Sequence, residues 1–261
     1  MGAKTALLAF ADGDLRSALL DARPSAPADA EVLVREALPG YDVTLVGDSS
    51  LDASYPPDDI TCATVLPGAE VLCDRRLVLE RPSELPAHLL AAGAGRRIVM
   101  HGMHSVVDWL CFAVWEDGRL IRSLSLSPDG GIVENIGEPF DFERPYWAGE
   151  HPVEPVPGCS DEGPYPLPFH PLELGEEALR ALFGFVIEGF PAPDDIEAHT
   201  VRMYEFRVVD PSGDEQAARE AAYKQALRDM GPPRLFRLRP DGRMREISWD
   251  EFSGRPAPEN S

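Results

Sequence analysis

Short apolar runs separated by turn residues dominate the first two thirds of the chain and predict β-strands. Residues 5–11 are almost wholly apolar and end at Asp12-Gly13-Asp14, a pattern typical of a buried strand that is followed by a turn. Similar runs predict strands at 41–46, 60–66, 69–73, 76–79, 98–100, 132–135 and 201–209, and a last hairpin from 235–238 and 244–247.

Helical spacing of apolar residues occurs in fewer places. It predicts helices over 29–38, 83–92, around 179–186 and over an amphipathic 214–230, with a helical turn at 15–20. Strand, helix and strand follow one another at the start of the chain, which suggests an α/β-like beginning.

The segment Val106–Trp115 is the most informative part of the pattern. It is apolar on both alternating faces except at Asp108, as expected for a strand covered on both sides in the middle of a sheet. Asp117-Gly118 follows and predicts a hairpin with a type I′ turn into residues 119–126.

These elements predict an α+β fold, with a single mixed β-sheet domain and flanking helices. We expect a main domain over residues 1–210, a C-terminal helix-hairpin appendage over 211–252 and a disordered tail over 253–261. Residues 138–171 are rich in proline and show no periodicity, and a loop of this length inside a domain is usually either functional or a linker.

The charge of the chain bears on its partners. A formal net charge of −21 over 261 residues would repel phosphate backbones and anionic membrane surfaces, so we expect neither nucleic acid nor membrane as a partner. Arg75-Arg76 and Arg96-Arg97 are only pairs, too few for a basic patch. The four cysteines form no CxxC motif, and no signal peptide or membrane span is evident, so we expect a cytoplasmic, reduced protein.

Several runs carry a resemblance to a known family. These are MGAKTALLAFADGD, HGMHSVVDWLCFAVWEDGRLIRSLSLSPDGG, PYWAGEHPVEP and PLPFHPLELGEEALRALFGF. They resemble an uncharacterised family of high-GC Gram-positive bacteria that is catalogued only as a domain of unknown function, over roughly residues 1–209. The resemblance implies a cytosolic bacterial origin and a single module, and it carries no activity.

A first candidate for chemistry is a divalent metal site. His101, His104 and Asp108 could supply two imidazoles and a carboxylate to zinc or iron, with positions left open for water or substrate. Residues three apart on a continuous strand point to opposite faces, so both histidines could bind one ion only if Gly102 interrupts the strand. The alternative is that these side chains only donate hydrogen bonds and cap a turn.

A second candidate is a set of carboxylates that follows two strands. Asp12 and Asp14 come directly after the first strand and Asp48 follows the second, where paired carboxylates often hold Mg²⁺. The DxD pattern superficially resembles the nucleophile motif of haloacid-dehalogenase-type phosphatases. It departs from that motif at Arg16, and the only downstream lysine is Lys224. We favour a simple acidic turn with a helix cap.

The third candidate is the proline-rich segment, which concentrates aromatic residues. Aromatic side chains give large contact areas at low entropy cost, and prolines order the backbone in advance, which suits a recognition surface. The alternative is that the segment only covers the core. The binding residues that we predict there are Tyr146, Trp147, Glu150, His151, Phe169 and His170.

Two functions are therefore open. The first is a non-catalytic binding module for a protein or small molecule, possessing no cofactor, in which the acidity of the chain favours a basic partner. The second is a metal-assisted hydrolase or phosphotransfer-type enzyme that uses one of the two ligand sets, with Glu150 or His151 as a base. No GxxxxGK[ST], GxGxxG, GxSxG or HExxH motif is present.

Overall fold

The computed structural model describes residues 2–21, 23, 26–154, 165–229, 235–239 and 244–253. The chain forms two compact units, Met1–Pro211 and Ser212–Ser261. The first unit contains the proline-rich segment and all of the candidate residues.

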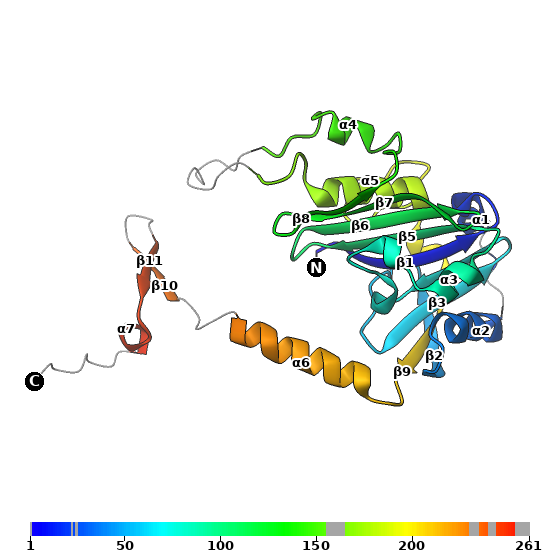
Figure 1. Cartoon of the computed structure of the whole chain (residues 1–261), viewed down its shortest axis with the longest axis horizontal. Coiled ribbons are helices and arrows are strands. Elements are labelled where there is room, and N and C mark those ends of the chain that lie inside the picture. The colour runs from blue at the N-terminus through cyan, green and yellow to red at the C-terminus, as the bar shows by residue number, and fades with distance from the viewer. Residues whose placement is uncertain are drawn as a thin grey trace, which may run out of the picture. The chain divides into compact units, whose positions relative to one another are not determined.

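A nine-stranded antiparallel sheet forms the centre of the first unit (Figure 1). Its order is β2-β9-β3-β4-β1-β5-β6-β7-β8. The strands are β1 (Lys4–Ala11), β2 (Asp42–Ser50), β3 (Ile60–Leu66), β4 (Ala69–Cys73), β5 (Arg97–His104), β6 (Trp109–Glu116), β7 (Arg119–Ser127), β8 (Gly131–Ile136) and β9 (Arg202–Val209).

The fold combines helices with this sheet, as the predicted α+β class requires. The sheet itself differs from the prediction of a mixed sheet, because every pairing between its described strands is antiparallel. The α/β-like beginning is also wrong. Although β1 and β2 flank helices in sequence, β4, β3 and β9 lie between them in the sheet.

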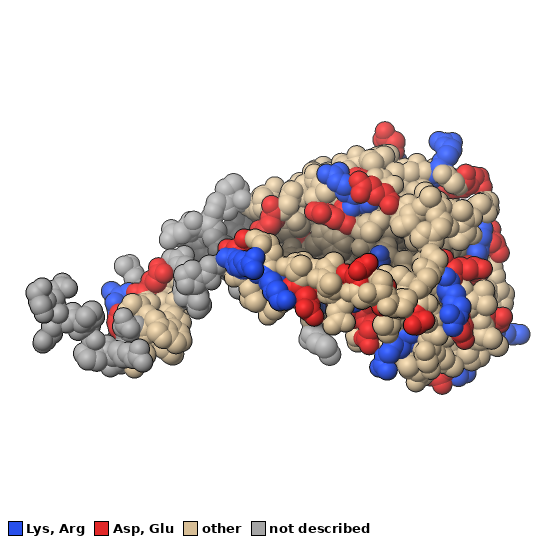
Figure 2. Space-filling model, turned by 60° about the horizontal axis from the view of Figure 1, so that its bottom comes forward, with Lys and Arg blue, Asp and Glu red and all other residues tan. Residues whose placement is uncertain are grey.

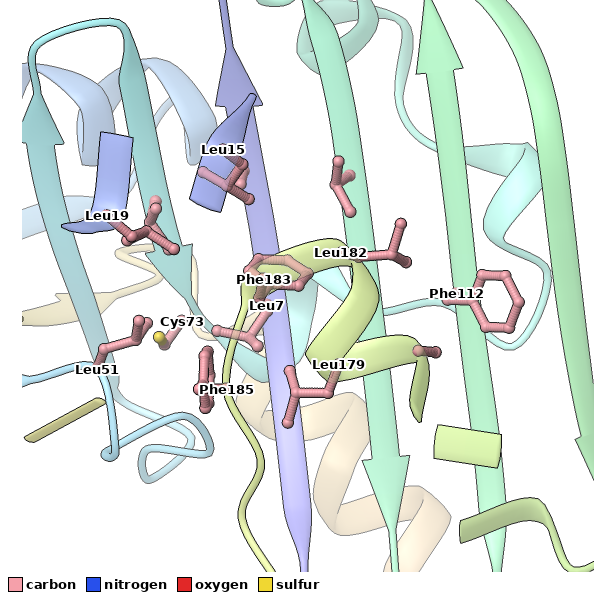
Figure 3. Packing of buried hydrophobic residues seen from close by; sticks show 14 of the residues in the cluster. Leu7, Leu15, Leu19, Leu51, Cys73, Phe112, Leu179, Leu182, Phe183 and Phe185 are labelled. Carbon is pink, nitrogen blue, oxygen red and sulfur yellow. The ribbon is translucent and has the colours of Figure 1, made fainter. Parts of the chain in front are cut away.

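Helices cover both faces of the sheet, so each strand carries apolar side chains in both directions. On one face, α5 (Pro171–Phe183) and α1 (Leu15–Leu20) pack against the strands, and Leu179 and Phe183 of α5 lie over β1 (Figure 3). On the other face, α2 (Pro27–Ala37) and α3 (Ala87–Ala92) cover residues such as Phe10 and Trp115. A core therefore forms on each side.

The predicted central strand is largely confirmed. Strand β6 lies between β5 and β7 and is buried on both faces, but it begins at Trp109 and not at Val106. Val106 and Val107 are exposed in the turn from β5, where Asp108 has a φ of +47°. This backbone conformation, which Asp and Asn tolerate better than most residues, ends the strand pattern early.

The next hairpin follows the prediction. Strands β6 and β7 are joined through Asp117 and Gly118, whose φ values are +49° and +73°. Positive φ at both central positions is what a type I′ turn requires, and the sequence Asp-Gly supplies it at low cost.

Three predicted elements differ in detail. Residues 76–79 are not a strand, because Asp74 caps a 3₁₀ turn, η1 (Arg75–Leu77), by accepting from the Arg76 N–H. The helix predicted over 83–92 is divided at Pro86 into a 3₁₀ turn, η2 (Pro82–Glu84), and α3. Helix α5 begins earlier than predicted and ends at Gly184, with a φ of +84°.

The second unit contains α6 (Asp214–Asp229), the hairpin strands β10 (Leu235–Leu238) and β11 (Met244–Ile247), and α7 (Trp249–Ser253). A helix and a hairpin were predicted here. Helix α6 was predicted to be amphipathic, but it buries no apolar face. None of its residues is buried, and Tyr223 and Leu227 are exposed. Of the predicted disordered tail over 253–261, Ser253 is the last residue of α7, and residues 254–261 lie outside the described residues.

The remaining short helices are α4 (Arg144–Trp147) and a 3₁₀ turn, η3 (Ala198–Thr200). Helix α4 lies within the proline-rich segment, over the same face of the sheet as α5 (Figure 1). This placement brings the two halves of the segment against the first turns of α5.

Candidate functional site

A cleft of about 590 Å³ lies between α5, the segment after α4 and the chain that follows α5. Tyr146, His151 and His170, three of the predicted binding residues, line it. The other lining residues are Ala3, Leu172, Glu173, Glu176, Glu177, Glu188 and Gly189. The volume is in the range of about 300–1,000 Å³ that is usual for ligand pockets.

A buried ion pair holds one wall of this cleft. Arg122 of β7 and Glu143 have no exposed side-chain surface, and Nη2 of the guanidinium lies 2.6 Å from Oε2 of the carboxylate. The same carboxylate accepts from the backbone N–H of Phe140 and from the indole Nε1–H of Trp147. Arg122 also donates to Asn135. Because these partners satisfy both charges, α4 is fixed to the sheet.

The aromatic residues of the proline-rich segment pack mainly onto the core. Phe169 is fully buried, and its ring meets those of Trp147 and Tyr146 edge to face, with centroids 5.0 Å and 5.4 Å apart. Phe140 and Phe142 are partly buried against the same core. These rings therefore cover the core, which is the alternative that the sequence analysis left open. Trp147 and Phe169 are not among the residues that line the cleft.

Tyr146 connects this cover to the cleft. Its ring stacks on His151 with a centroid distance of 4.1 Å and an interplanar angle of 14°, and its hydroxyl donates to the backbone carbonyl of Glu173 at 3.3 Å. Burial, and then the carboxylates of Glu177 and Glu173, raise the pKa of Tyr146 to about 12. The phenol therefore stays neutral near pH 7.

His170 stands at the mouth of the cleft and caps α5. Its Nδ1 accepts from the Leu172 N–H at 3.3 Å, and its Nε2 lies 3.7 Å from the carboxylate of Asp108. Its ring stacks on Tyr165, whose pKa is raised to about 12 by burial and by Asp108 and Glu173.

Four glutamates line the cleft, whereas none of its described lining residues is Lys or Arg. Glu176 accepts from the backbone N–H groups of Ile187 and Glu188, and Glu177 pairs with Arg180 at 2.5 Å. Glu173 and Glu188 are exposed at the rim. Elsewhere the two signs of charge mix, and Asp and Glu lie next to Lys and Arg over the face in Figure 2.

The structure does not bring the first metal candidate together. His101 is buried beneath α5, where its ring nitrogens contact the Thr5 hydroxyl at 2.8 Å and the Gly175 carbonyl at 3.0 Å, and burial lowers its pKa to about 4. His104 lies three residues on in the uninterrupted β5 and so points to the opposite face. Asp108 faces His170.

The second metal candidate is also dispersed. Asp12 pairs with Arg96 at 2.7 Å, and Asp14 caps α1 by accepting from the backbone and hydroxyl of Ser17. Asp48 lies on the edge strand β2 and pairs with Arg202 at 2.8 Å. Within the described ranges, no three His, Cys, Asp or Glu side chains form a group that could hold a metal ion.

Sequence reasoning missed the glutamates that line the cleft, Glu173, Glu176, Glu177 and Glu188, which we call its acidic wall. Glu150 is exposed and is not among the cleft-lining residues, whereas Glu173, Glu176 and Glu177 are. Their spacing of three and four residues places them on one side of α5, and this signal was present in the sequence. Glu188 could not be found in this way, because it reaches the cleft only through the turn at Gly184.

A comparison with protein families bears on the whole first unit. A family model described as a family of unknown function, DUF6928, matches residues 5–206. The chain belongs to this family. The match covers nearly all of the nine-stranded sheet and every cleft-lining residue except Ala3, so both are parts of the DUF6928 module.

No curated protein and no solved structure matches the chain. No helix in the described part of this DUF6928 member is long and apolar enough to cross a membrane.

Proposed function

We propose that the chain is a non-catalytic binding module whose cleft accepts a positively charged group of its ligand. The observation that carries the proposal is the combination of four glutamates with stacked aromatic rings in one cavity. The ligand class is an organic cation, such as the guanidinium or ammonium group of a basic partner.

Electrostatics supports a cation as the occupant. Burial is the main cause of the raised pKa values of Tyr146 and Tyr165, and the carboxylate of Glu173 adds to both. Glu173 is exposed at the rim, and its side chain has no partner among the described residues. A guanidinium that reaches it would form a charge-assisted hydrogen bond.

The aromatic wall supports a flat or alkyl-bearing cation. Tyr146 and His151 stack as a pair, which orients the exposed imidazole beside a phenol that burial holds in place. Because Tyr146 is buried, the ring of this pair that a ligand can reach is the exposed imidazole of His151. The cleft therefore offers both charge and a stacking surface to the same group.

The rigidity of the wall supports binding without large rearrangement. Glu143 ties α4 to β7, and Phe169 holds Tyr146 and Trp147 from below. A preformed wall reduces the ordering cost of association.

The metal-assisted enzyme stays a prediction that no observation in the structure favours. Its two ligand sets are each engaged in separate structural contacts, as described for His101, Asp14 and Asp48. We therefore keep the binding module as the proposal.

We also propose that this module acts in the cytoplasm. Cys62 and Cys73 lie directly opposite each other on β3 and β4, and both are free thiols in the structure. A reducing compartment would maintain two such neighbours as thiols.

Calorimetric titration with arginine amide tests the binding proposal. We expect saturable binding that Glu173→Gln weakens by about tenfold, because one charge-assisted hydrogen bond is worth roughly 1.5 kcal/mol or more. Glu36→Gln on α2 is the matched control, since Glu36 is exposed and does not line the cleft. Citrulline amide, whose side chain is uncharged but otherwise similar in shape, should bind more weakly. Equal affinity for all three proteins would contradict the proposal.

A further inference from the structure

The aromatic ring of Tyr55 gathers basic side chains from three separate parts of the sequence. The Arg75 guanidinium lies 4.1 Å from the ring centroid and the Lys4 ammonium 5.6 Å from it. The imidazole of His104 meets the same ring edge to face, with centroids 5.6 Å apart. These four residues, which we call the Tyr55 cluster, are each half-buried, so they are positioned and still reachable from solvent.

The Tyr55 cluster is separate from the cleft. Lys4 and His104 are partners in the pairing of β1 with β5, and both point to the face of the sheet opposite the one that α5 covers. Ala3, the residue before Lys4, lines the cleft, whereas Lys4 does not. The two sites thus lie on opposite faces, and each can be altered without the other.

Charge within the cluster is not balanced by the protein. Arg75 pairs with Asp58 at 2.8 Å through Nη1, whereas no described residue forms an ion pair with Lys4. One positive charge therefore remains in excess here, in a chain whose formal net charge is −21. Both cations contact the same aromatic ring, and each cation–π contact favours a position beside Tyr55.

We propose that Lys4, Arg75 and His104 form a binding site for a small phosphate-type dianion. The Lys4 ammonium supplies a compact charge, and Nη2 of Arg75, which has no acceptor among the described residues, supplies a directed donor. His104 supplies the third donor. Its Nδ1 accepts from the backbone N–H of Val106, so in the neutral ring the proton is on Nε2.

The chemistry of the donors identifies the ligand class. A phosphate monoester has about −1.5 to −2 charge near neutral pH and three strong acceptor oxygens, as many as the basic side chains that meet at the Tyr55 ring. Burial, and then the charge of Lys4, lower the pKa of His104, and a bound dianion would reverse the second effect. Three basic groups are too few for a polyanion, whose affinity depends on many phosphate contacts.

The test is an NMR titration of the full chain with inorganic phosphate at constant ionic strength, with the imidazole signals as the readout. We expect a saturable shift of the His104 signals and a rise in the pKa of His104, while the signals of the exposed His199 stay unchanged. A parallel titration with methyl phosphate distinguishes a phosphate monoester from free phosphate, because only a site open on one side accepts the ester.

Variants of the two lysines in the sequence complete the test. Lys4→Gln should weaken phosphate binding by about tenfold, as expected for loss of a charged hydrogen-bond donor, and Lys4→Arg should keep it within a few-fold. Lys224→Gln, in the second unit, is the matched control and should bind as the unaltered chain does. The proposal is overturned if the His104 shift does not saturate, or if it is the same in Lys4→Gln.

Discussion

The Arg122 guanidinium on β7 and the Glu143 carboxylate in front of α4 form an ion pair from which solvent is wholly excluded, with Nη2 and Oε2 2.6 Å apart. The pair is the point at which the proline-rich segment is tied to the sheet. Tyr146 follows three residues later, so the pair also determines where the aromatic wall of the cleft stands.

Breaking this pair from one side should be strongly destabilising. Glu143→Gln leaves the Arg122 charge buried without its counter-ion, and such losses cost about 3–5 kcal/mol. Urea unfolding followed by circular dichroism would measure the change in the free energy of unfolding. The double variant Arg122→Met/Glu143→Leu removes both charges and should lose less than the single variant. A single-variant loss below about 1 kcal/mol would show that the pair is not an anchor.

The left-handed turn after α5 gives a second prediction. Gly184 has a φ of +84°, and a Cβ there would lie 2.8 Å from Cδ1 of Ile196 and 2.9 Å from Cγ of Arg16. Gly184→Ala should therefore lower the melting temperature, with a backbone cost of about 1–2 kcal/mol before any contact is counted. Gly13→Ala is the control, because nothing lies within 4 Å of its Cβ position, and it should be nearly neutral. Equal melting temperatures for the two variants would count against this explanation.

The buried His101 predicts how stability depends on pH. Its pKa in the folded chain is about 4, below the ordinary value of 6.5, so the unfolded chain binds the proton more readily. The stabilisation is complete above pH 6.5 and is lost as the pH falls through this window towards about 4, by at most about 3 kcal/mol. His101→Gln should flatten the plot of unfolding free energy against pH between these values. An unchanged slope would mean that His101 binds its proton equally well in the folded and the unfolded chain, which would contradict the lowered pKa.

The described cysteines should react slowly. Burial raises the pKa of Cys62 to about 11, and it raises the pKa of Cys73 and Cys111 as well. Because the thiolate is the reactive form, native protein should be labelled by iodoacetamide at these three positions far more slowly than protein unfolded in urea. Peptide mass spectrometry after a timed pulse measures each position separately, and fast native labelling of Cys73 would contradict its burial.

Much of the sheet could be predicted, because its signals are local. The strands at 60–66 and 69–73 were placed to the residue, and the Asp117-Gly118 turn was assigned by type. Strand order was not accessible, since β9 inserts between β2 and β3 through contacts remote in sequence. The periodicity of single strands does not specify which strands pair.

The candidate sites depended even more on long-range contacts. Tyr146, His151 and His170 were selected for their chemistry and do meet in one cleft, but its acidic wall belongs to a helix that was treated only as packing. Arg75 was set aside because Arg75-Arg76 is only a pair in sequence. Its contact with the ring of Tyr55, which Lys4 also contacts, joins residues far apart in the chain and could not be predicted.

The most direct test of the central claim is to map where arginine amide binds, by following the backbone amide NMR signals during a titration. The account predicts saturable shifts confined to Ala3 and residues 146–151, 170–177 and 188–189, which contain the residues that line the cleft. Shifts that are absent from these residues, or spread evenly over the acidic surface, would contradict a binding function for the cleft.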